Sequence, residues 1–127
     1  MTQNILVVDD DPELHDLITF ALKRHGYDVV SAPDAFAGLR ILSEMKVDLA
    51  MLDIMMPRMD GLEMLSKLRE DHPDLRVIMM TAISTPEAAV AALRDEACDF
   101  LAKPFDIADL ISAVDTALSM QPHGHQD

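Results

Sequence analysis

Several features that would indicate other classes of protein are missing or scarce in this sequence. Cys98 is the only cysteine among 127 residues, which excludes an internal disulfide and fits a reducing compartment. No apolar run approaches the length of a membrane span, about 18 residues, and only Met1 to Asn4 precede the first apolar run, too few for a signal peptide. A Walker loop and a G-x-G-x-x-G turn are both absent, which disfavours a nucleotide site. We therefore expect a cytoplasmic protein without a membrane segment.

Basic residues are also few. Ten Lys and Arg residues stand against 23 Asp and Glu residues, which gives a formal net charge of -13 at pH 7. The phosphates of nucleic acid would repel such a chain, so we expect no direct contact with nucleic acid and a partner with a basic surface. The length and the 50% hydrophobic content suit one globular domain. We expect this domain over residues 1–120, followed by a polar tail at 121–127.

Short apolar runs rich in β-branched residues alternate with segments whose apolar residues recur at helical spacing. We expect strands at 4–8, 27–32, 47–52, 76–80 and 98–102. We expect helices at 13–25, 33–45, 62–71, 86–95 and 106–119. Thr85, before Pro86, is a predicted helix N-cap, and Gly26 is a predicted left-handed residue after the first helix. Five alternating units predict an α/β fold with an open parallel sheet covered by helices on both faces.

Acidic residues follow two of these strands. Asp9 and Asp10 come directly after the first strand, and Asp53 comes directly after the third. Because parallel sheets bind ligands beyond the carboxyl ends of their strands, we expect these three carboxylates to converge. At about 5 Å and an effective dielectric near 20, each pair would repel by roughly 3 kcal/mol. The sequence therefore predicts a bound cation, and oxygen ligands favour Mg²⁺. Asp11 is predicted to be a helix cap or a solvated residue.

Two further polar residues follow the fourth and fifth strands. Thr81 and Lys103 stand at the same end of the predicted sheet as the acids. A metal, a carboxylate, a hydroxyl and an ammonium are the groups that handle a phosphoryl group, because they neutralise and hydrogen-bond its oxygens. Asp53 stands alone at its strand end and is the candidate nucleophile, since carboxylates can form acyl-phosphates.

Four motifs carry a resemblance to a known family. They are Val7–Asp11, Asp53–Gly61, Met80–Ala82 and Lys103–Phe105. In this order and at these spacings, they resemble the receiver (response-regulator) domain of two-component signal transduction, of the CheY-like superfamily, over about residues 3 to 119. The resemblance implies a flavodoxin-like (βα)5 doubly wound parallel sheet with strand order 2-1-3-4-5.

The resemblance also implies a reaction and a metal. Asp53 would accept a phosphoryl group from a sensor histidine kinase or a phosphotransfer protein. Asp10 and Asp53 would bind Mg²⁺, with Mn²⁺ able to substitute. Asp9 would act through a water molecule, and the backbone carbonyl of Met55 would complete the ligands.

A conformational switch is the third implication. Thr81 and Lys103 would contact the phosphoryl group, and Phe100 would move inward when Thr81 is drawn toward it. The change would reach the fourth helix, fifth strand and fifth helix, where an effector domain, an effector protein or a second copy would bind. Turnover of an external substrate is not implied. The apolar Met55 and Ile83 stand where polar residues could orient an attacking water, so dephosphorylation is expected to be slow.

Two other classes of phosphoryl-transfer protein would show different sequence patterns. An aspartyl-phosphate hydrolase also uses a carboxylate nucleophile with Mg²⁺, Thr and Lys, but it would typically place the nucleophile after its first strand. Here Asp53 follows the third strand. A histidine phosphotransfer protein would be all-helical, against the alternating pattern.

Overall fold

The computed structural model describes residues 2–82, 85–94 and 97–119. Five parallel strands form one sheet in the order β2-β1-β3-β4-β5, as predicted. The strands are β1 (Asn4–Val8), β2 (Asp28–Ala32), β3 (Leu49–Asp53), β4 (Arg76–Thr81) and β5 (Asp99–Ala102). The helices are α1 (Pro12–Arg24), α2 (Ala35–Glu44), α3 (Gly61–Asp71), α4 (Pro86–Arg94) and α5 (Ile107–Ser119). The flavodoxin-like fold class is therefore confirmed.

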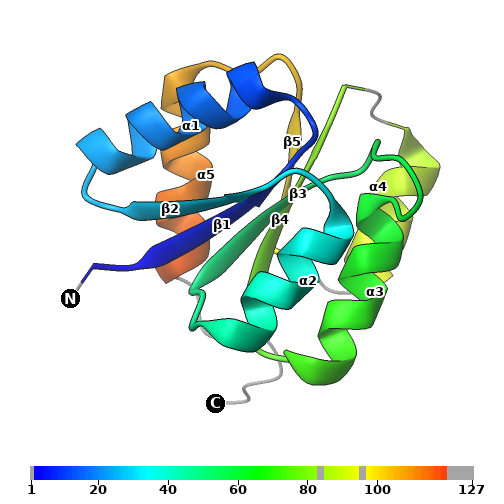
Figure 1. Ribbon diagram of the computed structural model, residues 1–127. Coiled ribbons are helices and arrows are strands. Elements are labelled where there is room, and N and C mark those ends of the chain that lie inside the picture. The colour runs from blue at the N-terminus through cyan, green and yellow to red at the C-terminus, as the bar shows by residue number, and fades with distance from the viewer. Residues whose placement is uncertain (1, 83–84, 95–96, 120–127) are drawn as a thin grey trace.

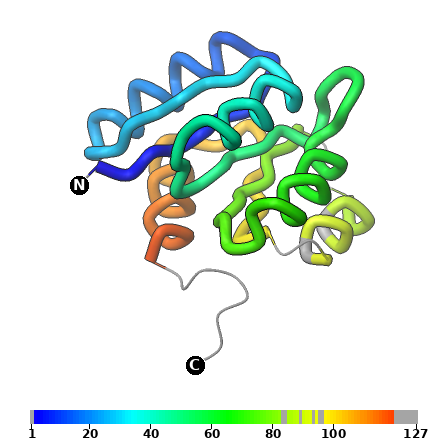
Figure 2. The backbone as a smooth tube through the Cα atoms, turned by 60° about the horizontal axis from the view of Figure 1, so that its bottom comes forward, coloured from blue at the N-terminus to red at the C-terminus, as the bar shows by residue number. Residues whose placement is uncertain are grey.

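Helices cover both faces of the sheet (Figure 1). Successive side chains of a strand point to opposite faces, so Leu6 and Val8 pack among side chains of α2 and α3. Ile5 and Val7 pack among side chains of α1 and α5. Figure 2 shows the same division from another direction, with α1 and α5 apart from α3 and α4. Because both faces are buried, the central strands are apolar throughout, which is what made them recognisable in the sequence.

Several helix ends are fixed by the residues predicted to fix them. The Asp11 carboxylate accepts a hydrogen bond from the Glu13 amide at 3.0 Å and is the N-cap of α1. The Thr85 hydroxyl accepts one from the Ala88 amide at 3.1 Å at the start of α4. Gly26 has φ of +95°, the left-handed conformation that glycine adopts without steric cost.

The third strand begins two residues later than predicted. Asp48 was expected inside the strand, but its carboxylate accepts a hydrogen bond from the Asn4 amide at 2.8 Å, and regular pairing starts at Leu49. Conversely, Asp53 and Thr81 are the last residues of β3 and β4 rather than the first residues beyond them.

Some predicted features lie outside the described residues. They are Ile83, the end of the fourth helix at residue 95 and the polar tail at 121–127. Among the described helices, none is both long enough and apolar enough to cross a membrane.

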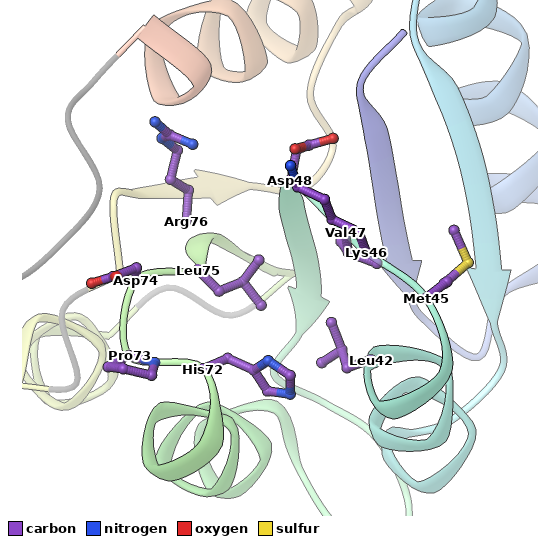
Figure 3. Close-up of a pocket in the computed structure, with 10 residues that line it drawn as sticks. All are labelled: Leu42, Met45, Lys46, Val47, Asp48, His72, Pro73, Asp74, Leu75 and Arg76. Carbon is purple, nitrogen blue, oxygen red and sulfur yellow. The ribbon is translucent and has the colours of Figure 1, made fainter. Parts of the chain in front are cut away.

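A hollow of about 500 Å³ opens where β3 and β4 begin (Figure 3). Lys46, Asp48 and Arg76 are among the residues that line it. The hollow therefore lies at the amino-terminal ends of these strands, opposite to their carboxyl ends. The lining includes none of the predicted site residues, so this hollow is not part of the predicted site.

A polar cluster joins the segment between α1 and β2 to α5, on the α1 side of the sheet. The Tyr27 hydroxyl donates a hydrogen bond to one carboxylate oxygen of Asp115. The other oxygen lies 3.0 Å from Nε2 of His25, just beyond α1. Burial of the phenol, followed by its hydrogen bond to Asp115 and the charge of that carboxylate, raises the pKa of Tyr27 to about 12.

The raised pKa of Tyr27 can be measured directly, because the chain has one tyrosine and no tryptophan. We expect an ultraviolet absorbance titration to place the midpoint of phenol ionisation near 12, against about 10 for a free tyrosine. Stability gained from this contact is complete below the unfolded pKa and is lost as the pH rises through the folded pKa. Asp115→Asn should bring the midpoint closer to 10. A wild-type midpoint at 10, with the circular dichroism spectrum still native, would contradict the contact.

Candidate functional site

The predicted acids meet at the carboxyl end of the central strands. Asp9 follows β1 directly, and Asp53 is the last residue of β3. The parallel register pairs Val8 with Leu52, the residues immediately before these two aspartates. The two side chains are therefore neighbours because the strands are paired in register, as the sequence predicted.

Three carboxylates come together at this point. One oxygen from each of Asp9, Asp10 and Asp53 lies within 4.8 Å of the others. Asp9 is fully buried and Asp53 is 3% exposed, whereas Asp10 is exposed to solvent. The cluster therefore combines two buried charges with one that reaches the solution.

The donor set fits a hard divalent cation. All three side chains offer carboxylate oxygens, which Mg²⁺ prefers. Opposite ligands of an octahedral Mg²⁺ stand about 4.2 Å apart, twice the metal–oxygen distance. The three carboxylate oxygens all lie within 4.8 Å of one another, close enough for one cation to contact all three.

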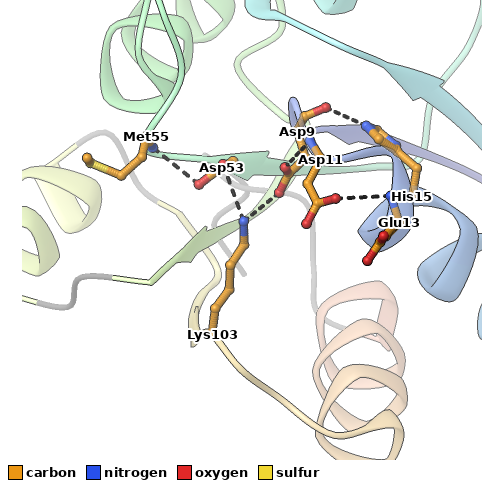
Figure 4. A network of polar contacts seen from close by, with 7 residues as sticks. All are labelled: Asp9, Asp11, Glu13, His15, Asp53, Met55 and Lys103. Atoms are coloured by element: carbon orange, nitrogen blue, oxygen red, sulfur yellow. Dashed lines mark hydrogen bonds and ion pairs between the residues drawn. The ribbon is translucent and has the colours of Figure 1, made fainter.

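Lys103 bridges the two buried carboxylates (Figure 4). Its ammonium donates a hydrogen bond to Asp9 Oδ2 at 2.6 Å and lies 3.3 Å from Asp53 Oδ2. The lysine comes from the loop after β5, as predicted. It lies closer to Asp9 than to Asp53, which the sequence did not indicate.

Backbone amides hold the remaining carboxylate oxygens. The Met55 amide donates to Asp53 Oδ1 at 3.2 Å, and the Asp11 amide donates to Asp9 Oδ1 at 2.9 Å. Each buried aspartate therefore has one oxygen toward the lysine and one toward the main chain, which fixes the orientation of both side chains.

Burial and charge shift the pKa of two groups in the site. Burial of the Asp53 carboxyl and the nearby charge of Asp9 raise its pKa, and Lys103 only partly opposes this. Burial alone would lower the pKa of the Lys103 ammonium, but its contacts with Asp9 and Asp53 outweigh this effect and raise it. Lys103 is therefore cationic at neutral pH, while the charge on Asp53 is unfavourable without further cations.

Thr81 and Phe100 lie on adjacent strands. Thr81 is fully buried at the end of β4, and its carbonyl accepts a hydrogen bond from the Lys103 amide at 2.8 Å. Phe100 pairs with Met79 across β4 and β5. Its partly buried ring packs against the core on the α2 and α3 side. The structure thus places the two predicted switch residues near each other on adjacent strands.

Sequence reasoning missed three contacts beside the site, made by His15 and Arg58. Nε2 of His15, on α1, lies 2.5 Å from the Asp9 carbonyl oxygen (Figure 4). Arg58, in the loop before α3, forms an ion pair of 2.9 Å with Asp34 and lies over the ring of Phe36. No local pattern connects these residues, so no signal in the chain could have identified the contacts.

Comparison with known proteins gives a consistent result. The response regulator receiver domain family matches residues 5–115. Transcriptional regulatory protein GlrR of Escherichia coli (strain K12) is 40% identical over 115 residues, which are 91% of this chain and 26% of that protein. The crystal structure of a CheY-like response regulator receiver domain protein from Methanospirillum hungatei JF-1 aligns with a TM-score of 0.90 and 32% identity, covering 93% of this chain and 94% of that one.

Another solved structure contains ligands. Response regulator protein TrrA from Thermotoga maritima, in complex with Mg²⁺ and BeF, aligns with a TM-score of 0.83 and 29% identity, covering 91% of this chain and 99% of that one.

The curated relatives are longer proteins. This chain spans about a quarter to a half of the length of those it matches. The match to the receiver domain itself covers most of the chain and includes the acidic residues, Thr81 and Lys103. The four motifs, the strand order and the family match agree, and the chain belongs to the response regulator receiver domains of two-component signal transduction.

Proposed function

We propose that Asp53 accepts a phosphoryl group from a sensor histidine kinase or a phosphotransfer protein in a reaction that depends on Mg²⁺. The observation that carries this proposal is the convergence of Asp9, Asp10 and Asp53 at the carboxyl end of the strands, where Lys103 contacts both Asp9 and Asp53. Buried acids that repel one another are suited to a site that takes up cations and phosphoryl oxygens.

The proposed metal ligands are those that the family resemblance implies, and the exposure of Asp10 supports them. Asp10 is exposed and would bind Mg²⁺ directly, together with Asp53 and the Met55 carbonyl. Asp9, already held by Lys103, would act through a water molecule. When bound, Mg²⁺ would supply positive charge to the oxygens of the phosphoryl group, and Mn²⁺ would serve as a substitute. The Mg²⁺ and BeF complex of the Thermotoga maritima regulator supports this choice.

Asp53, Lys103 and Thr81 have separate proposed roles in the transfer of the phosphoryl group. An Asp53 carboxylate oxygen would form the new bond to phosphorus while the bond to the donor's histidine nitrogen breaks. The Lys103 ammonium would turn from the carboxylates to a phosphoryl oxygen, and the Thr81 hydroxyl would donate a hydrogen bond to another. Both groups already lie at the same carboxyl end of the strands as Asp53.

The phosphorylated form is proposed to persist. Met55 is 55% exposed beside Asp53, and its thioether offers no strong hydrogen bond to orient a water. The domain would therefore lose the phosphoryl group slowly and act as a switch rather than as a turnover enzyme.

The signal is proposed to leave through the face formed by α4, β5 and α5. Thr81 lies at the end of β4, before α4, and Phe100 lies on β5. A shift of Thr81 toward the phosphoryl group would let the Phe100 ring move further inward. The exposed Val90 on α4 suits a contact with an effector domain, an effector protein or a second copy of the chain.

Direct contact with nucleic acid is not part of the proposal. Some relatives are named as DNA-binding or transcriptional regulators, but this chain matches under half of their length. The net charge of -13 would repel DNA phosphates. We propose that residues 1–120 form the receiver domain and that residues 121–127 are a polar tail.

The proposal is tested by labelling with acetyl phosphate. With Mg²⁺ present, intact-mass spectrometry should show the addition of one phosphoryl group, and brief alkali should remove it, as expected of an acyl-phosphate. Asp53→Asn should abolish the addition, because the nucleophile is gone, and chelation of Mg²⁺ should greatly slow it. Asp16→Asn, an exposed change on α1, is the matched control. Labelling of Asp53→Asn at the wild-type level would refute the assignment.

A further inference from the structure

The loop between β3 and α3 contains an unusual backbone conformation. Arg58 has φ of 70°, the left-handed region that residues with a Cβ adopt at a steric cost. Glycine or asparagine would be more favourable at such a position. Some other interaction must therefore favour arginine in this loop.

Two contacts hold the Arg58 side chain against α2. Nη2 of Arg58 lies 2.9 Å from Asp34 Oδ2, and the guanidinium lies 5.2 Å from the centre of the Phe36 ring. Asp34 is itself fixed, because its other oxygen accepts a hydrogen bond from the Ala37 amide at 2.8 Å as the N-cap of α2. The loop, green in Figure 2, is thus tied to the first turn of a neighbouring helix.

The same loop carries Met55, whose carbonyl is a proposed metal ligand. Within the loop, the Met59 amide donates to the Pro57 carbonyl at 2.8 Å and the Gly61 amide to the Ile54 carbonyl at 3.0 Å. These bonds join the Arg58 segment to the end of β3. A displacement of Arg58 would therefore be transmitted to the backbone at Met55.

We propose that Arg58 is a positioning residue for the metal site: clamped between Asp34 and Phe36, it holds the β3–α3 loop in which the Met55 amide contacts Asp53 and the Met55 carbonyl is the proposed ligand. The part of this proposal that concerns metal binding rests on the proposed function. Arg58 is 66% exposed, so an ion pair alone would contribute little. Arg58 also contacts the Phe36 ring, and both of its partners lie at the N-terminus of α2. These two features together make the arrangement a clamp.

Loss of the Arg58 charge and loss of the Arg58 contacts should change the Mg²⁺ affinity in opposite directions, which makes the role testable. Removing a positive charge near an acidic cluster should tighten binding of a cation. Loss of the clamp should weaken it, by roughly threefold to tenfold for contacts of this kind. We expect calorimetric titration with Mg²⁺ to show weaker binding for Arg58→Gly, although glycine relieves the backbone. Phe36→Ala should weaken it without a change of charge, and Arg58→Lys should largely restore it.

Controls separate the clamp from general effects. Arg40→Gly removes an exposed arginine from α2 and should not weaken Mg²⁺ binding. Asp34→Asn keeps a good N-cap but loses the ion pair, so it should resemble Phe36→Ala. Arg58→Gly binding Mg²⁺ as tightly as the wild type, or more tightly, would overturn the proposal.

A second measurement does not depend on metal. In the metal-free protein, hydrogen exchange at the Met59 and Gly61 amides should be severalfold faster in Arg58→Gly and Phe36→Ala than in the wild type. Unchanged exchange in both variants would show that the clamp does not order the loop. If the wild type did not bind Mg²⁺, the proposed metal site would fail, whereas faster exchange in the variants would still support the clamp.

Discussion

Lys103→Met is expected to lower the free energy of unfolding of the metal-free protein by about 3 kcal/mol at neutral pH. The change leaves the buried carboxylates of Asp9 and Asp53 without their cation, while the methionine keeps most of the lysine side-chain volume. Millimolar Mg²⁺ should recover much of the loss, because it binds the folded form and replaces the missing charge. Urea unfolding with a chelator and then with Mg²⁺ measures both effects.

The control for this change is Lys67→Met, on the exposed side of α3, which should leave the unfolding free energy almost unchanged. Asp53→Asn should have the opposite sign in the metal-free protein. The raised pKa of Asp53 means that the folded state favours its neutral form, so wild-type stability falls as the pH rises through the folded pKa. The asparagine variant lacks this fall. Equal urea midpoints for Lys103→Met and Lys67→Met would contradict this account of the site.

The sequence predicted the site well where its geometry follows from strand ends. Asp9, Asp53, Thr81 and Lys103 each stand at or just beyond the end of an apolar run, and parallel pairing brings such ends together. Strand positions followed from the apolar runs and strand order from the family resemblance, and together they predicted the cluster. The pairing of Lys103 with Asp9 at 2.6 Å needed side-chain geometry and was not predicted.

Contacts made by residues in the connecting segments could not be predicted in the same way. Arg58 and Asp34 are 24 residues apart, and Tyr27 and Asp115 are 88 apart. Neither pair lies on a strand whose register would fix it. Their contacts depend on the path of connecting segments, for which apolar periodicity carries no information. The late start of β3 also depends on a side-chain contact: the Asp48 carboxylate accepts a hydrogen bond from the Asn4 amide just before strand pairing begins.

Gly61→Ala is expected to lower the free energy of unfolding by about 3 kcal/mol and to slow phosphorylation of Asp53. A Cβ at Gly61 would lie 2.3 Å from the Asp53 carbonyl oxygen and 2.9 Å from the Ile54 Cα. These are backbone atoms, so no side-chain rotation relieves the clash and either α3 or the end of β3 must move.

Gly26→Ala is the matched control, because a Cβ there meets no atom within 4 Å. Its cost comes only from the left-handed backbone, about 1 kcal/mol, and its distance from the site should leave phosphorylation unchanged. Urea midpoints and the rate of labelling by acetyl phosphate together distinguish the two glycines. If both variants lost the same stability and were labelled at the same rate, the close approach of α3 to the phosphoacceptor strand would not be what requires glycine at position 61. The expected difference arises because Gly61 lets the first turn of α3 lie directly against the backbone that positions the Asp53 carboxylate.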